Sequence, residues 1–347
     1  MKEREVSRDL STRQLIFMDY KPPYSITNTM LDYVASIMEK IGRINNYDNL
    51  NKMPILRKNM RIHSVHSTLA IEENNLSENQ VKDVINGKTV IGPEKEIREV
   101  KNAYRAYEQI GHISPYSIDD LLKIHKIMTD MLVTESGKFR SGNEGVFDEE
   151  GNCIFVAPPP EMVLELMNNL FDYLNKEKNN VNPLILSSLF HYEFVFIHPF
   201  ADGNGRMARL WQTMILADWK EVFAYVPIES LIKDYQDDYY KAINECNNKG
   251  DSTIFVEFML KMIDETLTSL IDNINKELTH RNEYVNKLLE VMDVGIPMSS
   301  KELMDKLNLK SRKSFRENYI QPALDMNLIK MTEENKPTSK NQRYYKE

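Results

Sequence analysis

One short loop past the middle of the chain decides the fold class, because it lies between two strongly helical stretches. Its sequence is His198-Pro199-Phe200-Ala201-Asp202-Gly203-Asn204-Gly205-Arg206-Met207-Ala208-Arg209. The segment before it, 183–197, begins with Asn182-Pro183, an N-cap followed by proline at the first helical position. It is apolar nearly all round until His198-Pro199 ends it. This pattern predicts a central, buried helix that ends at the loop.

Helical periodicity extends over most of the chain, which has 12 glycines in 347 residues and long stretches without a helix breaker. Residues 162–174 place apolar side chains four apart on one face, as in an amphipathic helix. Segments 96–110, 227–246 and 253–272 show the same period. The sequence therefore predicts a mainly α protein whose middle is a helical bundle.

The pattern changes between Gly137 and Pro160. Two short runs of β-prone residues flank an acidic turn that contains Gly151, and three prolines follow the second run. Such a pattern is typical of a β-hairpin.

The glycines and arginines of the loop are suited to holding phosphates. Gly203 and Gly205 let the backbone approach an anion closely. The helix that begins near Arg206 offers unpaired N–H groups and the positive end of its dipole. Arg206 and Arg209 are three residues apart on its first turn, so they can grip different phosphates of one polyphosphate. We expect an anion-binding nest here.

The same loop carries an acid and a base. Asp202 can hold a hard cation such as Mg²⁺, which prefers oxygen ligands and commonly shares them with phosphates. His198 has an unperturbed pKa near 6.5 for its residue type, and it can take a proton from an incoming hydroxyl. Together these groups indicate proton transfer beside a bound polyphosphate.

At every defined position the loop resembles the signature of the Fic family, H-P-F-x-[D/E]-G-N-G-R-x-x-R. The resemblance extends over roughly residues 60–270 and implies a Fic-fold helical bundle. Fic proteins typically transfer AMP from ATP to a Ser, Thr or Tyr hydroxyl of a target protein. The resemblance therefore implies a protein adenylyltransferase, with ATP as substrate, His198 as general base and Asp202 as Mg²⁺ ligand.

The resemblance also assigns the triphosphate to residues of the loop. It implies that Asn204 and the backbone from Gly203 to Gly205 hold the α- and β-phosphates with help from Arg206, and that Arg209 binds the γ-phosphate. The hairpin at 137–160 resembles the family's flap, which aligns a target segment by strand addition. This implies a protein partner bound along 137–160, and it leaves self-modification and a homodimer open.

A second motif bears on control. The segment Ser67 to Asn75 resembles the family's inhibitory sequence [S/T]-x-x-x-E-[G/N]-N, with Thr68, Glu72 and Asn74 in place. Glu73 departs from the expected Gly or Asn. The resemblance implies that Glu72 pairs with Arg209 and keeps the γ-phosphate from being held productively. We expect both glutamates on a helix, with Glu73 rotated about 100° away from Glu72.

The C-terminal residues 296–347 differ in charge from the rest. They contain 11 Lys or Arg and 7 Asp or Glu, a net +4, whereas the remaining residues sum to −12. Ser299 and Glu302 form a predicted capping box at the start of a helix. The segment resembles the winged helix-turn-helix module often attached to Fic proteins, with 328–346 as the wing. Arg312, Lys313 and Arg316 could meet DNA phosphates, and docking of a protein is an equal alternative.

Composition limits the remaining choices. The net charge of −8 argues against a chain that coats nucleic acid, and two cysteines cannot build a disulfide framework. The start of the chain is charged, and no apolar run reaches the length of a membrane span. We therefore expect a cytoplasmic protein without a membrane anchor.

These observations combine into one set of expectations. The domains are an N-terminal helical arm with the inhibitory helix (1–95), a catalytic core (96–273), a linker helix (274–295) and a winged helix (296–347). Two alternatives to AMP transfer stay open: removal of AMP by the same site, and a DNA-binding regulator whose core senses nucleotide.

Overall fold

A computed structural model describes residues 20–45, 54–147, 153–326, 328–333, 335, 336 and 339–346. The chain divides into two compact units, Met1–Thr268 and Ser269–Glu347, and the division falls inside one helix, α12 (Thr253–Glu290). None of the described helices combines the length and the apolar character needed to cross a membrane.

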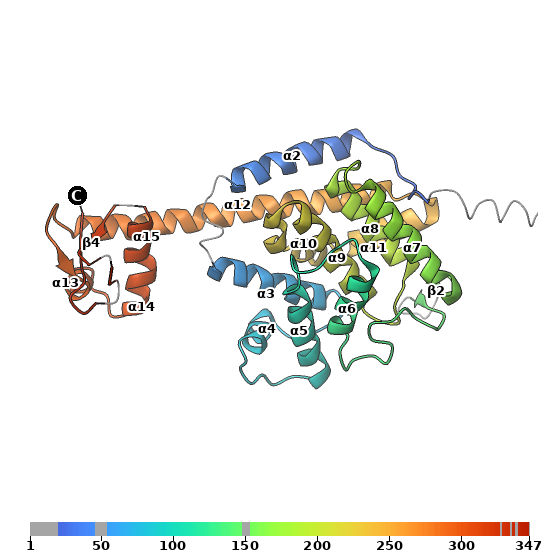
Figure 1. The fold of residues 1–347 in the computed structure, drawn as a ribbon, viewed down its shortest axis with the longest axis horizontal. Helices are drawn as coiled ribbons and strands as arrows, with labels where there is room; N and C mark the ends of the chain where they lie inside the picture. The colour runs from blue at the N-terminus through green and yellow to red at the C-terminus, as the bar shows by residue number, and fades with distance from the viewer. Residues whose placement is uncertain are drawn as a thin grey trace, which may run out of the picture. The chain divides into compact units, whose positions relative to one another are not determined.

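The first unit is built almost entirely of helices (Figure 1). In chain order its helices are α2 (Asn28–Asn45), α3 (Pro54–Ala70), α4 (Glu78–Ile85), α5 (Glu94–Tyr107), α6 (Ile118–Met128), α7 (Pro160–Glu177), α8 (Pro183–Ile197), α9 (Asn204–Trp219), the 3-10 helix η1 (Glu221–Tyr225), α10 (Ile228–Asp234), α11 (Gln236–Lys249) and the first part of α12. The predicted mainly α class is confirmed.

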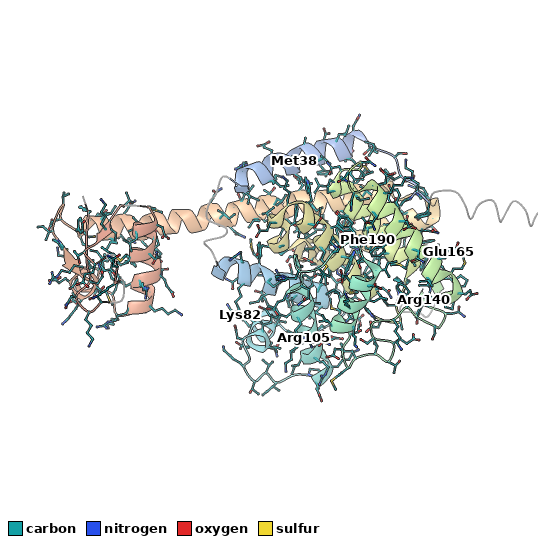
Figure 2. All side chains as sticks on the ribbon, viewed as in Figure 1. Met38, Lys82, Arg105, Arg140, Glu165 and Phe190 are labelled. Atoms are coloured by element: carbon teal, nitrogen blue, oxygen red, sulfur yellow. The ribbon has the colours of Figure 1, made fainter. Side chains whose placement is uncertain are left out.

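Helices α8 and α9 pack against each other in the middle of this unit. Asn182 accepts a hydrogen bond from the backbone N–H of Leu184, and Pro183 is the first helical residue, so α8 begins where the sequence predicts. The ring of Phe171 makes edge-to-face contacts with Phe190 on α8, which is labelled in Figure 2, and with Trp211 on α9. Both side chains are fully buried, so the loop connects two helices that form the centre of the core.

The hairpin consists of β1 (Gly145–Phe147) and β2 (Cys153–Val156), which pair antiparallel. Gly145 pairs with Val156 and Phe147 with Cys153, and the register shifts between Val146 and Phe147. The hairpin expected at 137–160 is thus present, whereas its acidic turn, 148–152, lies outside the described residues.

Two helix boundaries differ from the expectation. The expected helix at 227–246 is two helices, α10 and α11, which meet at Tyr235. Asp237 and Asp238 occupy the first turn of α11, where acidic side chains favour a new N-terminus. Conversely, the separate helices expected at 253–272 and 274–293 are one helix, α12, because no Gly or Pro interrupts that stretch.

The second unit contains the C-terminal end of α12, a three-stranded sheet and short helices. These are β3 (Met298–Ser299), α13 (Ser300–Lys306), α14 (Arg312–Phe315), the π-helix η2 (Arg316–Ile320), α15 (Gln321–Asp325), β4 (Lys330–Met331) and β5 (Arg343–Tyr345), in the sheet order β3-β5-β4. The predicted capping box between Ser299 and Glu302 is present. Strand β3 was not predicted, because two residues carry too little pattern.

Candidate functional site

The loop between α8 and α9 is bent by two left-handed residues. His198 ends α8 with φ 52°, and Gly203 precedes α9 with φ 84°. A non-glycine residue in this region is strained, and such residues gather at functional sites. The fold must therefore hold His198 in place from outside the loop.

Arg140 supplies that support. Its Nε donates to the carbonyl of His198 at 2.7 Å, and its backbone N–H donates to the carbonyl of Pro199 at 2.9 Å. Its remaining guanidinium nitrogens donate to the carbonyls of Gly142 and Pro158, which flank the hairpin. Arg140 is 3% exposed, so one buried cation ties both ends of the hairpin to the strained histidine (Figure 2).

His125 of α6 supports the loop from the other side. Its ring stacks on the ring of Phe200 with centroids 3.6 Å apart. Gly137 donates its N–H to His125 Nδ1, so Nε2 carries the proton and donates to the carbonyl of Asp202 at 3.0 Å. Burial lowers the pKa of His125 to about 4, which keeps the ring neutral and this pair of hydrogen bonds intact.

Asn204 closes the loop internally. Its Nδ2 donates to the carbonyl of Phe200 at 2.7 Å, and its Oδ1 accepts from the Phe200 N–H at 2.9 Å. The Asn204 side chain thus fixes the conformation of the loop. The backbone from Gly203 to Gly205 forms the N-terminus of α9, which has no side-chain cap.

Arg206 and Asp202 form an ion pair within the loop. Arg206 Nη2 lies 2.7 Å from Asp202 Oδ1, and Arg206 Nη1 lies 3.9 Å from Glu99 Oε1 on α5. Arg206 is 3% exposed, and among the described residues its Nε has no hydrogen-bond partner. A buried donor without a partner is costly, so the site is prepared for an additional acceptor such as a phosphate oxygen.

Asp202 is the loop's candidate metal ligand. Its side chain is 40% exposed, and its Oδ1 also accepts from the Gly203 N–H. In the described part of the chain no three His, Cys, Asp or Glu side chains gather into a metal cage. A single accessible carboxylate fits Mg²⁺, which binds proteins through one or two carboxylates together with substrate phosphates and water.

Arg209 is held by the segment that the sequence predicts to be inhibitory. Its Nη2 lies 2.7 Å from Glu72 Oε1, and it donates from Nε and Nη2 to the hydroxyl and the carbonyl of Thr68. Arg209 is 2% exposed. The ion pair uses one carboxylate oxygen, and Thr68 accepts two further hydrogen bonds from the arginine.

The Glu72 carboxylate also fills the space over the expected anion-binding nest. A Cβ atom added at Gly205 would overlap Glu72 Oε1 and would lie 3.0 Å from Arg209 Nη1. The carboxylate therefore occupies the position at the N-terminus of α9 where the loop would receive an anion.

Glu72 and Glu73 lie in a turn, so the expectation that both stand on a helix is wrong. Helix α3 ends at Ala70, and Glu73 adopts φ 64°. Asn74 fixes the turn to α5, since its Nδ2 donates to Glu99 Oε2 at 2.8 Å. The turn, and not a 100° rotation along a helix, separates the two glutamates. A left-handed residue here also explains why the motif expects Gly or Asn at this position.

We expect Glu73→Gly to stabilise the protein by about 1 kcal/mol, because glycine adopts the left-handed conformation without a Cβ penalty. Denaturant unfolding of both proteins measures the difference. Glu73→Ala is the matched control: it removes the same charge but keeps the Cβ atom. Equal stabilisation by both substitutions would assign the effect to charge instead of backbone strain.

A cavity of about 230 Å³ opens beside the loop. His198, Glu72, Gly205 and Arg209 line one part of it, and the other part is lined by Phe155, Val195, Phe196, Tyr239, Tyr240, Ile243, Asn244 and Asn247. The hairpin, the loop and α11 thus meet at one cavity. The loop and Glu72 contribute charged and imidazole groups, and α8, β2 and α11 contribute aromatic and aliphatic side chains together with two amides of α11.

A buried chain of hydrogen bonds fixes Tyr239 at this cavity. Gln212 Nε2 donates to Ser188, so its Oε1 accepts from Nδ1 of His191 at 2.6 Å. His191 Nε2 then accepts from the Tyr239 hydroxyl at 2.9 Å. Burial lowers the pKa of His191 to about 3, which keeps this direction of donation.

The acid–base state of His198 suits a general base. Burial lowers its pKa below the ordinary histidine value, and the nearby carbonyl of Val195 offsets part of that shift. The imidazole is therefore neutral at pH 7 and able to accept a proton.

Comparisons with known proteins match this geometry. Residues 115–216 match the Fic/DOC family, and residues 283–345 match the family described as Filamentation induced by cAMP protein Fic-like, C-terminal domain. A solved Fic family protein from Desulfovibrio desulfuricans is 41% identical, with a TM-score of 0.71, over 94% of this chain and 98% of that one. The chain belongs to the Fic family. The predicted Fic fold is thereby confirmed.

The names of curated relatives of this Fic chain state an enzymatic activity. A Nematostella vectensis protein named "Protein adenylyltransferase Fic" is 27% identical over 76% of this chain and 60% of its own length. "Protein adenylyltransferase fic-1" of Caenorhabditis elegans is 27% identical over 71% of this chain and 48% of its own length. The chain therefore spans about half the length of the curated relatives that it matches.

The structure brings the candidate residues of the Fic loop together and adds residues that sequence analysis missed. His198, Gly205, Arg209 and Glu72 share one cavity, although Glu72 and Arg209 are 137 positions apart. Arg140 and His125 were missed. Their local signals are weak: an arginine at the start of a hairpin and a histidine on the buried face of an amphipathic helix.

Proposed function

We propose that the protein transfers AMP from ATP to a hydroxyl group of a protein, and that the Glu72 carboxylate inhibits this reaction. The observation that carries the proposal is a partly buried, neutral His198 in the same cavity as a helix N-terminus and Arg209. The names of the curated relatives support the class of reaction.

In this mechanism the target hydroxyl attacks the α-phosphorus of ATP. His198 takes the hydroxyl proton as the oxygen–phosphorus bond forms, and the bond to the pyrophosphate oxygen breaks. Arg206 and the N–H groups of α9 stabilise the charge on the phosphates, and Arg209 holds the γ-phosphate. Mg²⁺ at Asp202, when bound, would neutralise further phosphate charge.

The proposed inhibition follows from competition for two groups. The γ-phosphate needs Arg209, which is bound to Glu72 and Thr68. The phosphates also need the space over Gly205, which the Glu72 carboxylate occupies. ATP must therefore displace Glu72 before it can bind productively.

The target segment would pair with the hairpin beside the cavity. Phe155 of β2 lines the cavity, and the neighbouring Val156 is 74% exposed. An extended peptide added along this strand would bring a Ser, Thr or Tyr hydroxyl toward His198. A segment of another copy of the chain would fit the same strand.

Incubation with labelled ATP and Mg²⁺ tests the proposal. We expect an AMP-sized mass increase on the protein itself or on lysate proteins, and a larger increase with Glu72→Gly. Release of AMP from modified proteins, without any addition, would assign the site to AMP removal.

A second proposed role rests on three positively charged side chains of the C-terminal unit. Arg312, Lys313 and Arg316 are all exposed on α14 and η2, and none forms an ion pair with another described residue. We propose that this unit is a winged helix that docks on a DNA backbone or on an acidic protein.

If the surface binds DNA, duplex affinity should fall steeply with salt, and charge reversal at the three positions should weaken binding to any sequence. Fluorescence anisotropy with a labelled duplex at two salt concentrations measures this. Absent or salt-insensitive binding would favour protein docking.

A further inference from the structure

A second hollow in the first unit, which we call the basic hollow, has a volume of about 610 Å³ and lies between α3, α5 and η1. Arg57, Lys58 and Arg61 of α3 line it together with Tyr225 of η1, and Glu108 and His112 lie at its border. It shares no lining residue with the catalytic cavity. Its volume falls within the range of small-molecule sites.

The two arginines of the basic hollow are held in fixed positions. Arg61 donates from Nη1 to the carbonyl of Tyr107 and from Nη2 to the carbonyl of Ala224. Arg57 donates from Nη1 to the Tyr225 hydroxyl at 3.2 Å. Both guanidinium groups lie over the Tyr225 ring, 5.2 and 5.9 Å from its centroid. Held in this way, they lose little conformational freedom when they bind a ligand.

The positive charge of the basic hollow is not neutralised. Among the described residues, none of its three cations forms an ion pair, and Lys58 donates from Nζ to the neutral amide oxygen of Asn86. Its single carboxylate, Glu108, accepts a hydrogen bond from Tyr104. The three cations and this one carboxylate give the Lys, Arg and Glu side chains of the lining a net charge of +2. Burial lowers the pKa of Arg61, and the nearby Tyr225 and Glu229 offset only part of that shift. A desolvated cation of this kind favours binding of an anion.

We propose that the basic hollow binds a small phosphate-bearing anion, separately from the catalytic loop. Two fixed guanidinium forks and an ammonium group suit phosphate oxygens, which accept several charge-assisted hydrogen bonds at once. The concave shape and limited size favour a small ligand over a nucleic acid.

Isothermal titration of the full chain with inorganic pyrophosphate tests the proposal. In wild type we expect one binding event that Arg57→Gln/Lys58→Gln weakens about tenfold or more, as expected for lost charge-assisted hydrogen bonds. The matched control is Lys82→Gln/Lys101→Gln, which removes two exposed positive charges of α4 and α5 outside the hollow (Figure 2 labels Lys82). The control should bind as wild type does.

Equal pyrophosphate affinity in wild type and in Arg57→Gln/Lys58→Gln would overturn the proposal, as would equal weakening by the control pair. If the double variant fails to fold, Lys58→Gln is tested alone, because Lys58 is exposed. This single substitution should still lower the pyrophosphate affinity several-fold. Repeating the titration with ATP distinguishes the two ligands. A higher affinity for ATP than for pyrophosphate, again lost in Arg57→Gln/Lys58→Gln, would identify the basic hollow as a nucleotide site.

Discussion

Replacing His198 with alanine should reduce AMP transfer by about two to four orders of magnitude, the usual range for a general base. ATP affinity should change little, because the imidazole acts on the target hydroxyl and not on the phosphates. Initial rates of label transfer and nucleotide titration separate the two effects. The wild-type rate should also fall on the acid side with an inflection below pH 6.5, since burial lowers the pKa of His198.

His63→Ala is the control for this substitution. His63 is a partly exposed histidine on α3, where it pairs with Glu78, and it lies outside the cavity lining. The control should transfer AMP at the wild-type rate. Comparable label incorporation by His198→Ala and wild type would remove His198 from the mechanism.

Replacing Glu72 with glycine should raise the transfer rate by about one to two orders of magnitude at a fixed ATP concentration. The substitution removes a charge-assisted contact worth about 1.5–3 kcal/mol and frees the space over Gly205 for a phosphate. Arg209 should stay in place, because Thr68 accepts two of its hydrogen bonds. Initial rates over a series of ATP concentrations measure the effect.

Two variants make the Glu72 experiment specific. Glu72→Gln keeps the size of the side chain but removes its charge, so it should activate less than glycine if space and charge both matter. Glu73→Gly should not activate, because Glu73 is not among the residues that line the cavity. Equal rates for wild type and Glu72→Gly would disprove the inhibition, and activation by Glu73→Gly alone would mean that the other glutamate inhibits.

Local patterns predicted the parts of the fold that depend on neighbours in sequence. Helix α8 begins at Pro183 and ends before His198 as predicted, because its cap, its proline and its stop signal are all adjacent to it. The capping box at Ser299 is local in the same sense. The loop residues from His198 to Arg209 form one motif, so their types alone indicated phosphate chemistry.

The features that were missed depend on contacts between distant residues. Arg140 donates to a carbonyl 58 positions away, and His125 bonds to one 77 positions away, so neither role leaves a local pattern. The end of α3 at Ala70 has a similar cause, since Asn74 stabilises the turn by bonding to Glu99 on another helix. Short elements such as β3 are set by the strand beside them.

In the proposed inhibition, the overlap between Glu72 and the space over Gly205 makes the glutamate a competitive inhibitor that is tethered to its own enzyme. A group on a short tether acts at an effective concentration on the order of millimolar. The ATP concentration that half-activates the protein is therefore set by the length and stiffness of the turn between Ala70 and Asn74, and not by the phosphate contacts alone. Inserting flexible residues there would dilute the tethered carboxylate, so the protein would respond to less ATP with its catalytic loop unchanged.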